Sequence, residues 1–442
     1  MCIRDSVSTP RTTLSAVNYN QGFRISEPHP WRVRRRQDPE WIKFYGDRET
    51  NSNYFSGGCS NEFYGDGLFP AKFRGNLFYC EPSLNIIHRC ILEREGPGYR
   101  GRRASKDSEF LVSTDQWFRP MNLRVGPHGA LYIVDMYREI IEDYSAIPRF
   151  LQQQYGLDKG RDRGRIWRLS PADAKLPPIP NLAEYSTDQL INAAVNAGSR
   201  WLRNTARRLL VERNDPKSIR AIRIALRDSA RSPQARINTL YTLAGLKAIK
   251  PVDDLVSHMS SQINQDYRVR IHAIRLAENF FTESTTQSTV VAAIHDPDPS
   301  VRLQAALSLA KLNWGSKPVE AHSHPLHRLA ERHGDDRWMD HAILSSAKEI
   351  SGKLAWDILT WNSGPTANSL PLLKPLSATA AGEQDEKSVS LILQTVPTST
   401  EKAQIECLTG LVEGLSDGPK LALSDAALVG IARLLRLSLI HI

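Results

Sequence analysis

The hydrophobic pattern divides the chain into two parts with different periods. Between about residues 50 and 170, short aromatic and β-branched runs are separated by Gly and Pro, which predicts β-strands joined by turns. The runs at 76–80 and 86–92 are the clearest. From about residue 182 onward, apolar residues recur at helical spacing. The pattern therefore predicts a β part followed by an α part.

The helical part repeats itself about every 33 residues. Asp-Pro or Ser-Pro pairs precede several of the expected helices, where proline ends one helix and the polar residue caps the next. An apolar residue, usually followed by Arg, opens each repeat at Leu202-Arg203, Ala235-Arg236, Val269-Arg270, Val301-Arg302 and Trp338-Met339. This pattern resembles HEAT repeats and predicts an α-solenoid.

Composition sets the expected boundaries. Residues 171–180 contain four prolines, which indicates a linker. Residues 1–6 and 437–442 back-translate into reverse-complementary strings, so we expect both to be adapter-derived and the natural protein to continue past them. The expected order is an artefact at 1–6, a β domain at 7–170, a linker at 171–181, a solenoid at 182–362, a loose connection at 363–385, further solenoid helices at 386–436 and an artefact at 437–442.

Charge and cysteine content exclude several classes of protein. Lys and Arg number 57 against 48 Asp and Glu, so the net charge is +9, a mild excess that requires no acidic partner. The 5 cysteines form no C-x-x-C, which argues against zinc ribbons, thioredoxin-like chemistry and covalent haem attachment in this chain. No apolar run approaches the roughly 18 residues of a membrane span, so we expect no transmembrane segment.

The segment 113–142 concentrates groups that suit a binding site. An Arg beside aromatic faces, at the end of a predicted strand, suits an anionic or sugar ligand. The alternative is that these residues pack, with Asp135 capping a turn, Trp117 in the core and Arg119 paired to a carboxylate. We assign no catalytic residue and no metal ligand. The candidate cofactor or ligand contacts are Trp117, Arg119, Asn122, Asp135, Tyr137 and Arg138.

The order of these motifs resembles the PVC-type haem-binding family, large exported bacterial proteins that are similar to membrane-bound dehydrogenases. The resemblance spans about residues 50–350 and depends on the segments at 75–82, 113–123, 126–142 and 161–168. It implies the C-terminal part of a β-propeller of the quinoprotein sugar dehydrogenase kind, followed by HEAT repeats. A cytochrome c domain with C-x-x-C-H would follow beyond this chain.

The resemblance implies a function for the longer protein. It would be an exported dehydrogenase of the periplasm or cell envelope that oxidises a sugar or an alcohol and passes electrons to a c-type haem. Pyrroloquinoline quinone and haem c are the implied cofactors, and the catalytic base would lie upstream of residue 1. The alternative is a non-catalytic envelope scaffold that binds proteins or glycans through its propeller and HEAT surfaces.

Cys59 and Cys80 flank a predicted hairpin centred near Phe69 and Pro70. Antiparallel pairing about this centre sets the two cysteines opposite each other, at a separation that a disulfide can bridge. Two reduced, buried thiols are the alternative from spacing alone. The exported location that the resemblance implies favours the disulfide.

Two further groupings have simpler explanations than a ligand site. The Arg residues of the first repeats could meet phosphates, but no aromatics interleave with them, so we expect a solvated face or Arg–Asp contacts between repeats and no nucleic acid. A histidine-rich stretch has spacings that a metal could use, but its prolines indicate a solvated loop. Its members are His322, His324, His327, His333 and His341.

Overall fold

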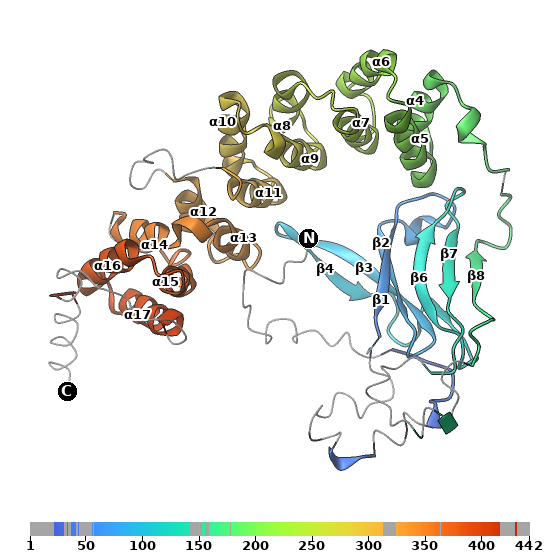
Figure 1. The fold of residues 1–442 in the computed structure, drawn as a ribbon, viewed down its shortest axis with the longest axis horizontal. Coiled ribbons are helices and arrows are strands. Elements are labelled where there is room, and N and C mark those ends of the chain that lie inside the picture. The colour runs from blue at the N-terminus through green and yellow to red at the C-terminus, as the bar shows by residue number, and fades with distance from the viewer. Residues whose placement is uncertain are drawn as a thin grey trace. The chain divides into compact units, whose positions relative to one another are not determined.

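The structure is a computed structural model in which the described residues form two compact units. The first unit holds nearly all of the sheets with helices α4 (Thr187–Asn196), α5 (Arg200–Arg213) and most of α6 (Pro216–Arg227). The second unit runs from Leu226 onward and also includes residues 95–98. Figure 1 shows the strands in blue to green and the later helices in green to red. The described residues are 22–30, 33, 37–40, 43, 55, 57–140, 150, 153–154, 159–176, 178–312, 324–362, 364–415 and 429–430.

Two antiparallel sheets form the body of the first unit (Figure 1). The first sheet has the order β1-β2-β3-β4, with β5 also paired to β3, and the second has the order β6-β7-β8. Consecutive strands pair along both sheets, so each is a meander. The strands are β1 (Cys59–Tyr64), β2 (Asn76–Glu81), β3 (Ile86–Glu95), β4 (Gly98–Arg103), β5 (Leu111–Val112), β6 (Pro120–Val125), β7 (Leu131–Asp135) and β8 (Arg165–Leu169).

The two sheets share one hydrophobic core. Alternate residues of β2, β6 and β7 are buried, as expected where one face of a strand meets a core. Side chains from both sheets therefore pack face to face. The buried members of this cluster are Tyr64, Phe69, Phe78, Cys80 and Ile87 around the first sheet, and Phe118, Leu123, Val125, Leu131 and Ile133 around the second.

A tight turn at 126–129 joins β6 to β7. Gly129 donates its N–H to the carbonyl of Gly126 at 3.0 Å and has a φ of +83°, a conformation that favours glycine. The predicted β part followed by an α part is confirmed. The described residues close no barrel or propeller ring: the second sheet ends at β8 and the first at β1 and β4.

Helix α5 is tied to the first sheet by two buried carboxylates. Asp66, which is 1% exposed, accepts the backbone N–H of Arg200 at 3.0 Å in the first turn of α5. Glu62 of β1 forms an ion pair with the Arg200 side chain. Burial raises the pKa of Asp66, while the Arg200 N–H and Arg203 oppose that shift. The compact first unit therefore continues past the Pro-rich segment at 171–181 and includes the first helices.

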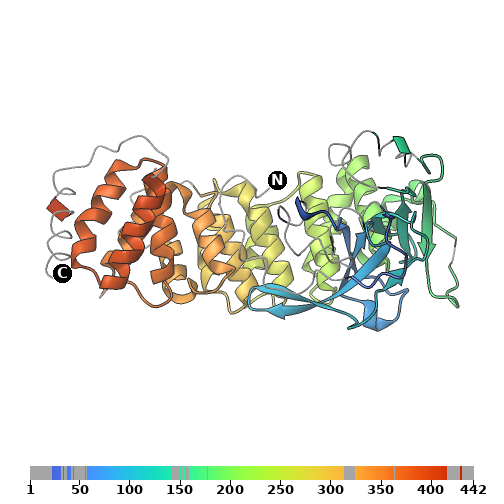
Figure 2. The ribbon, with the colours of Figure 1, turned by 90° about the horizontal axis from the view of Figure 1, so that it is seen from below.

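The helices of the second unit pack in chain order (Figure 2). Prolines open several helices of the chain as expected, with Pro216, Pro233 and Pro299 as first residues. The helices are α7 (Pro233–Gly245), α8 (Ser257–Met259), α9 (Tyr267–Ala277), α10 (Ser284–Ala292), α11 (Pro299–Leu309), α12 (Pro325–His333), α13 (Met339–Ser346), α14 (Ser351–Thr360), α15 (Leu373–Gly382), α16 (Glu386–Thr395) and α17 (Glu401–Leu415).

The repeated Arg donates hydrogen bonds to backbone carbonyls in the connection that precedes its own helix. Arg203 Nη1 donates to the carbonyls of Ala197 and Gly198 at 2.6 and 3.0 Å. Arg302 Nη1 likewise donates to the carbonyl of Asp296 at 2.7 Å. Each acceptor lies five or six residues before its Arg, so the motif fixes the backbone between helices. The repeated Arg in the sequence therefore stabilises the connection between two helices.

Arg270 adds a link between successive repeats. Its guanidinium binds both carboxylate oxygens of Asp296, at 2.8 and 2.7 Å, and its Nη1 donates to the carbonyl of Asn264 at 2.7 Å. The two side chains are 4% and 3% exposed. A buried bidentate pair of this kind leaves a costly unpaired charge when one partner is removed. An Arg–Asp contact of the kind expected in the first repeats is present here, in a later repeat.

The segment 363–385, which we expected to be a loose connection, contains helix α15 instead. Its residues Leu373, Leu376 and Ala380 are buried, and the helix packs against α14 and α17. A Cβ at Gly410 of α17 would lie 2.1 Å from the carbonyl oxygen of Lys374, so only glycine fits there without a backbone shift. The Ala, Gly and Ser content that suggests a linker belongs to tightly packed helices. Of the helices expected at 386–436, the structure describes α16 and α17; beyond residue 415 only residues 429–430 are described, and both chain ends lie outside the described residues.

Among the described residues, no helix is both long and apolar enough to cross a membrane. This agrees with the expectation from hydropathy.

We predict that Arg270→Ala lowers the free energy of unfolding by about 3 to 5 kcal/mol, because it leaves Asp296 buried without its partner. Urea unfolding followed by far-UV circular dichroism measures the change. Arg268→Ala on the same helix removes a half-exposed pair with Asp266 and should cost less than about 1 kcal/mol. Equal losses for the two variants would contradict this interpretation of the repeat motif.

Candidate functional site

The structure brings five of the six candidate ligand contacts together where β7 ends. The backbone carbonyl of Trp117 accepts the backbone N–H of Arg138 at 3.1 Å, and the centroid of the Trp117 ring lies 5.6 Å from that of the Tyr137 ring. Arg119 and Asp135 lie beneath them and are buried. Asn122 lies opposite Val134, on the other face of the sheet from Asp135.

Asp135 organises this end of the sheet. The side chain is 1% exposed, and its Oδ1 accepts the N–H groups of Arg119 at 2.8 Å and Tyr137 at 3.0 Å. Its Oδ2 accepts Arg165 Nε and Trp167 Nε1, both at 3.1 Å. Four donors therefore occupy the carboxylate. They connect the start of β6, the turn after β7 and the edge strand β8.

Arg119 is buried and directs its guanidinium to backbone carbonyls. Its Nη1 donates to Pro82 at 2.8 Å, its Nε to Arg138 at 2.9 Å and its Nη2 to Glu139. The side chain thus fastens the turn between β2 and β3 to the segment that follows β7. The packing interpretation expected Arg119 to pair with a carboxylate, but the guanidinium binds backbone carbonyls instead.

An exposed aromatic surface lies over this buried network. The Arg165 guanidinium lies 3.7 Å from the centroid of the Tyr137 ring and 5.3 Å from that of Trp167. Trp167 is 47% exposed, although its indole N–H is bound to Asp135. We call Trp117, Tyr137, Arg165 and Trp167 the aromatic edge. Arg165 and Trp167 were not predicted as site residues, because only the pairing of Asp135 with Arg165 across β7 and β8 brings them to this edge.

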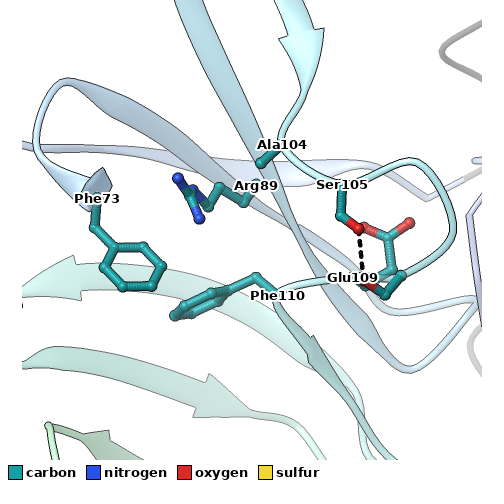
Figure 3. A pocket seen from close by; sticks show the side chains of 7 residues that line it. Phe73, Arg89, Ala104, Ser105, Glu109 and Phe110 are labelled. Atoms are coloured by element: carbon teal, nitrogen blue, oxygen red, sulfur yellow. Dashed lines mark hydrogen bonds between the residues drawn. The ribbon is translucent and has the colours of Figure 1, made fainter. Parts of the chain in front are cut away.

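A second constellation, a small pocket beside β3, was not predicted. Figure 3 shows the Arg89 guanidinium near the rings of Phe73 and Phe110, with Ser105 and Glu109 at the other end. The Arg89 guanidinium lies 4.4 Å from the centroid of the Phe73 ring. The pocket has a volume of about 200 Å³ and is lined by Phe73, Arg89, Ala104, Ser105, Ser108, Glu109 and Phe110.

Glu109 forms a buried charge network next to this pocket. Its side chain is 1% exposed, and it binds His88 Nδ1 at 2.5 Å and the guanidinium of Arg103. The backbone N–H of Phe23 also donates to it, at 3.1 Å. Burial alone would raise the pKa of Glu109, but the bonds from His88 and Arg103 outweigh burial and lower it.

Cys59 and Cys80 lie opposite each other in the pairing of β1 with β2, as the sequence spacing predicts. Both thiols are free in the structure. A hydrogen bond to Cys80 lowers the pKa of the Cys59 thiol, while the same contact and burial raise the pKa of Cys80. The disulfide between them stays a prediction.

The histidine-rich stretch was expected to be a solvated loop, but from residue 325 onward it forms helix α12, and its described histidines do not gather around one point. His324 caps α12, where its Nδ1 accepts the N–H of Leu326 at 3.2 Å, and burial lowers its pKa to about 4. His327 is buried against Trp361, and His341 is bound to Asp340. His322 lies outside the described residues. Nowhere in the part of the chain that the structure describes do three His, Cys, Asp or Glu side chains form a metal-binding group.

We predict that Glu109→Gln makes the first unit less stable near neutral pH. The pKa of Glu109 in the folded state lies below its unfolded value of about 4.3. Its ionised form therefore stabilises the fold above about pH 4.3, and the contribution disappears as pH falls through the folded pKa. Urea midpoints for the variant and the wild type should converge in acid.

Glu93→Gln is the matched control, because its carboxylate binds Arg102 on the surface and is 53% exposed. It should change little at any pH. A stability difference for Glu109→Gln that is the same in acid and near neutral pH would rule out the charge network as its cause.

Comparison with known proteins gives a family match for the β part alone. Residues 7–173 match a family model described as a domain of unknown function, DUF7133. No curated protein matches the chain. Two solved structures share 14% identity: an engineered protein, covering 52% of this chain and 97% of that chain with a TM-score of 0.21, and the CpcE–CpcF complex of phycocyanin lyase from Nostoc sp. PCC7120, covering 60% and 99% with a TM-score of 0.20. At these TM-scores neither likeness bears on the fold.

Proposed function

We propose that the first unit is a non-catalytic binding module that presents its aromatic edge to the sugar rings of a glycan. The observation that carries the proposal is the half-exposed ring of Trp167, held in place by the bond from its indole N–H to buried Asp135. A ring that is fixed before binding loses little conformational entropy when a ligand arrives.

The chemistry of the aromatic edge suits a sugar. Sugar rings have apolar C–H faces and polar hydroxyl rims, and aromatic side chains offer flat apolar area with few rotatable bonds. Arg165, which is 38% exposed, adds a guanidinium beside Tyr137 and Trp167. An apolar platform with one or two polar groups at its rim is the usual composition of a ligand site.

The buried charges beneath the edge favour binding over catalysis. Asp135 and Arg119 are the candidates best suited to acid–base or oxyanion chemistry. Asp135 accepts hydrogen bonds from four donors and Arg119 donates to three backbone carbonyls, all within the protein. They support the surface from below, and contact with a ligand falls to the exposed aromatic rings.

The test is affinity electrophoresis of the whole chain through gels that contain neutral or acidic polysaccharides. We expect at least one polysaccharide to retard the protein, and Trp167→Ala to weaken the interaction by about tenfold or more, as for truncation of an aromatic anchor. Trp338→Ala, at a tryptophan that is 38% exposed in the second unit, is the control and should migrate like the wild type. Unretarded wild type, or equal retardation of wild type and Trp167→Ala, would refute the proposal.

A second candidate applies to a longer protein that contains this chain. Two antiparallel meanders that share one core resemble neighbouring propeller blades, and helices follow them as HEAT repeats would. This supports an exported, quinone-dependent dehydrogenase for a sugar or an alcohol, with electrons passing to haem c in the periplasm or envelope. Further blades upstream and C-x-x-C-H downstream in the genomic reading frame are the expected result. If neither is found, the dehydrogenase proposal fails, and a non-catalytic scaffold that binds glycans or proteins is the better explanation.

A further inference from the structure

The pocket beside β3 is large enough for one small ring. Its volume of about 200 Å³ exceeds the roughly 150 Å³ of a cavity that holds benzene. Its walls come from the short helix Ala71–Phe73, from β3 and from the loop at 104–110 (Figure 3). It is separate from the aromatic edge and shares no residue with it.

Arg89 gives this pocket a positive charge that the protein does not neutralise. Its Nε donates to Asn76 Oδ1 at 2.6 Å and its Nη2 to the carbonyl of Lys72 at 2.7 Å, so the guanidinium is held in place. Within the described ranges, Nη1 has no hydrogen-bond partner and no carboxylate lies at ion-pair distance from Arg89. Burial lowers its pKa, as expected for a cation that lacks an anionic neighbour.

The one carboxylate that lines the pocket is already compensated. Glu109 is held by His88, by the Arg103 guanidinium and by the N–H of Phe23. It therefore cannot turn toward Arg89 without breaking buried bonds. The pocket retains an available cation, which favours an anionic ligand.

The other walls are apolar, with a small polar rim. The rings of Phe73 and Phe110 lie 5.7 Å apart and are tilted by 69°. Arg89 stacks on Phe73, so the hydrogen-bonding edge of its guanidinium stays available to a ligand in its plane. Ser105 and Ser108 bond to each other at 2.7 Å and supply hydroxyls at the opening.

We propose that this pocket binds a small organic carboxylate with a flat apolar body, and benzoate is the simplest probe. Its carboxylate accepts a hydrogen bond from Nη1 of Arg89, and its ring packs against Phe110. The charge selects the anion, and the two phenyl rings select the flat body.

Benzoate, benzyl alcohol and inorganic phosphate are titrated into the whole chain and followed by calorimetry and ligand-observed NMR. We expect benzoate to bind, and benzyl alcohol and phosphate to bind at least tenfold more weakly. Arg89→Gln should weaken benzoate binding by about tenfold or more, the usual loss of a charged hydrogen bond. Arg102→Gln, at an exposed Arg on the neighbouring strand β4, should bind benzoate like the wild type.

Because Arg89→Gln removes the stacking on Phe73 and can unfold the sheet, a second readout uses the unaltered protein. Phenylglyoxal modifies accessible arginines, and peptide mapping should show that benzoate protects Arg89 and leaves Arg102 reactive. The proposal fails if benzoate does not bind at millimolar concentration, if phosphate binds as well as benzoate, or if benzoate leaves Arg89 unprotected.

Discussion

A carboxylate buried from water must be surrounded by donors, and Asp135 shows how the first unit meets that constraint. Its two oxygens take N–H groups from the start of β6, from the turn after β7 and from two side chains of β8. The two carboxylate oxygens of Asp135 therefore hold β8, the turn after β7 and the segment that carries Arg119 in fixed positions. The hydrogen bonds of this buried carboxylate therefore also position the exposed rings of Trp167 and Tyr137.

Charged residues that suggest chemistry have architectural roles in both units. Arg119 binds carbonyls between two segments of the first unit, and Arg270 binds Asp296 between two helices of the second. In each case a buried guanidinium satisfies several acceptors at once, a role that its planar fork of five donors suits. Arg89 is different, because one of its nitrogens faces a pocket. A free donor at a concave, half-apolar place distinguishes a binding residue from a structural one.

Much of the fold follows from local signals in the sequence. The change of hydrophobic period locates the sheets and the helices, and proline pairs such as Ser232-Pro233 locate helix starts. The spacing of Cys59 and Cys80 predicts their register, because a hairpin is a local structure. Arg165 and Trp167 of the aromatic edge escape prediction because a long stretch of chain separates β7 from β8. The pocket escapes prediction because its walls come from three separate segments of the chain. Helix α15 escapes because small residues suit both linkers and close helix packing.

The most direct test of this account is the stability of Asp135→Ala. The substitution leaves Arg165 Nε, Trp167 Nε1 and two backbone N–H groups without their acceptor, so urea unfolding should show a loss of about 3 to 5 kcal/mol. An unchanged free energy of unfolding would contradict the account. Asp135 would then be better explained as a residue that contacts a ligand.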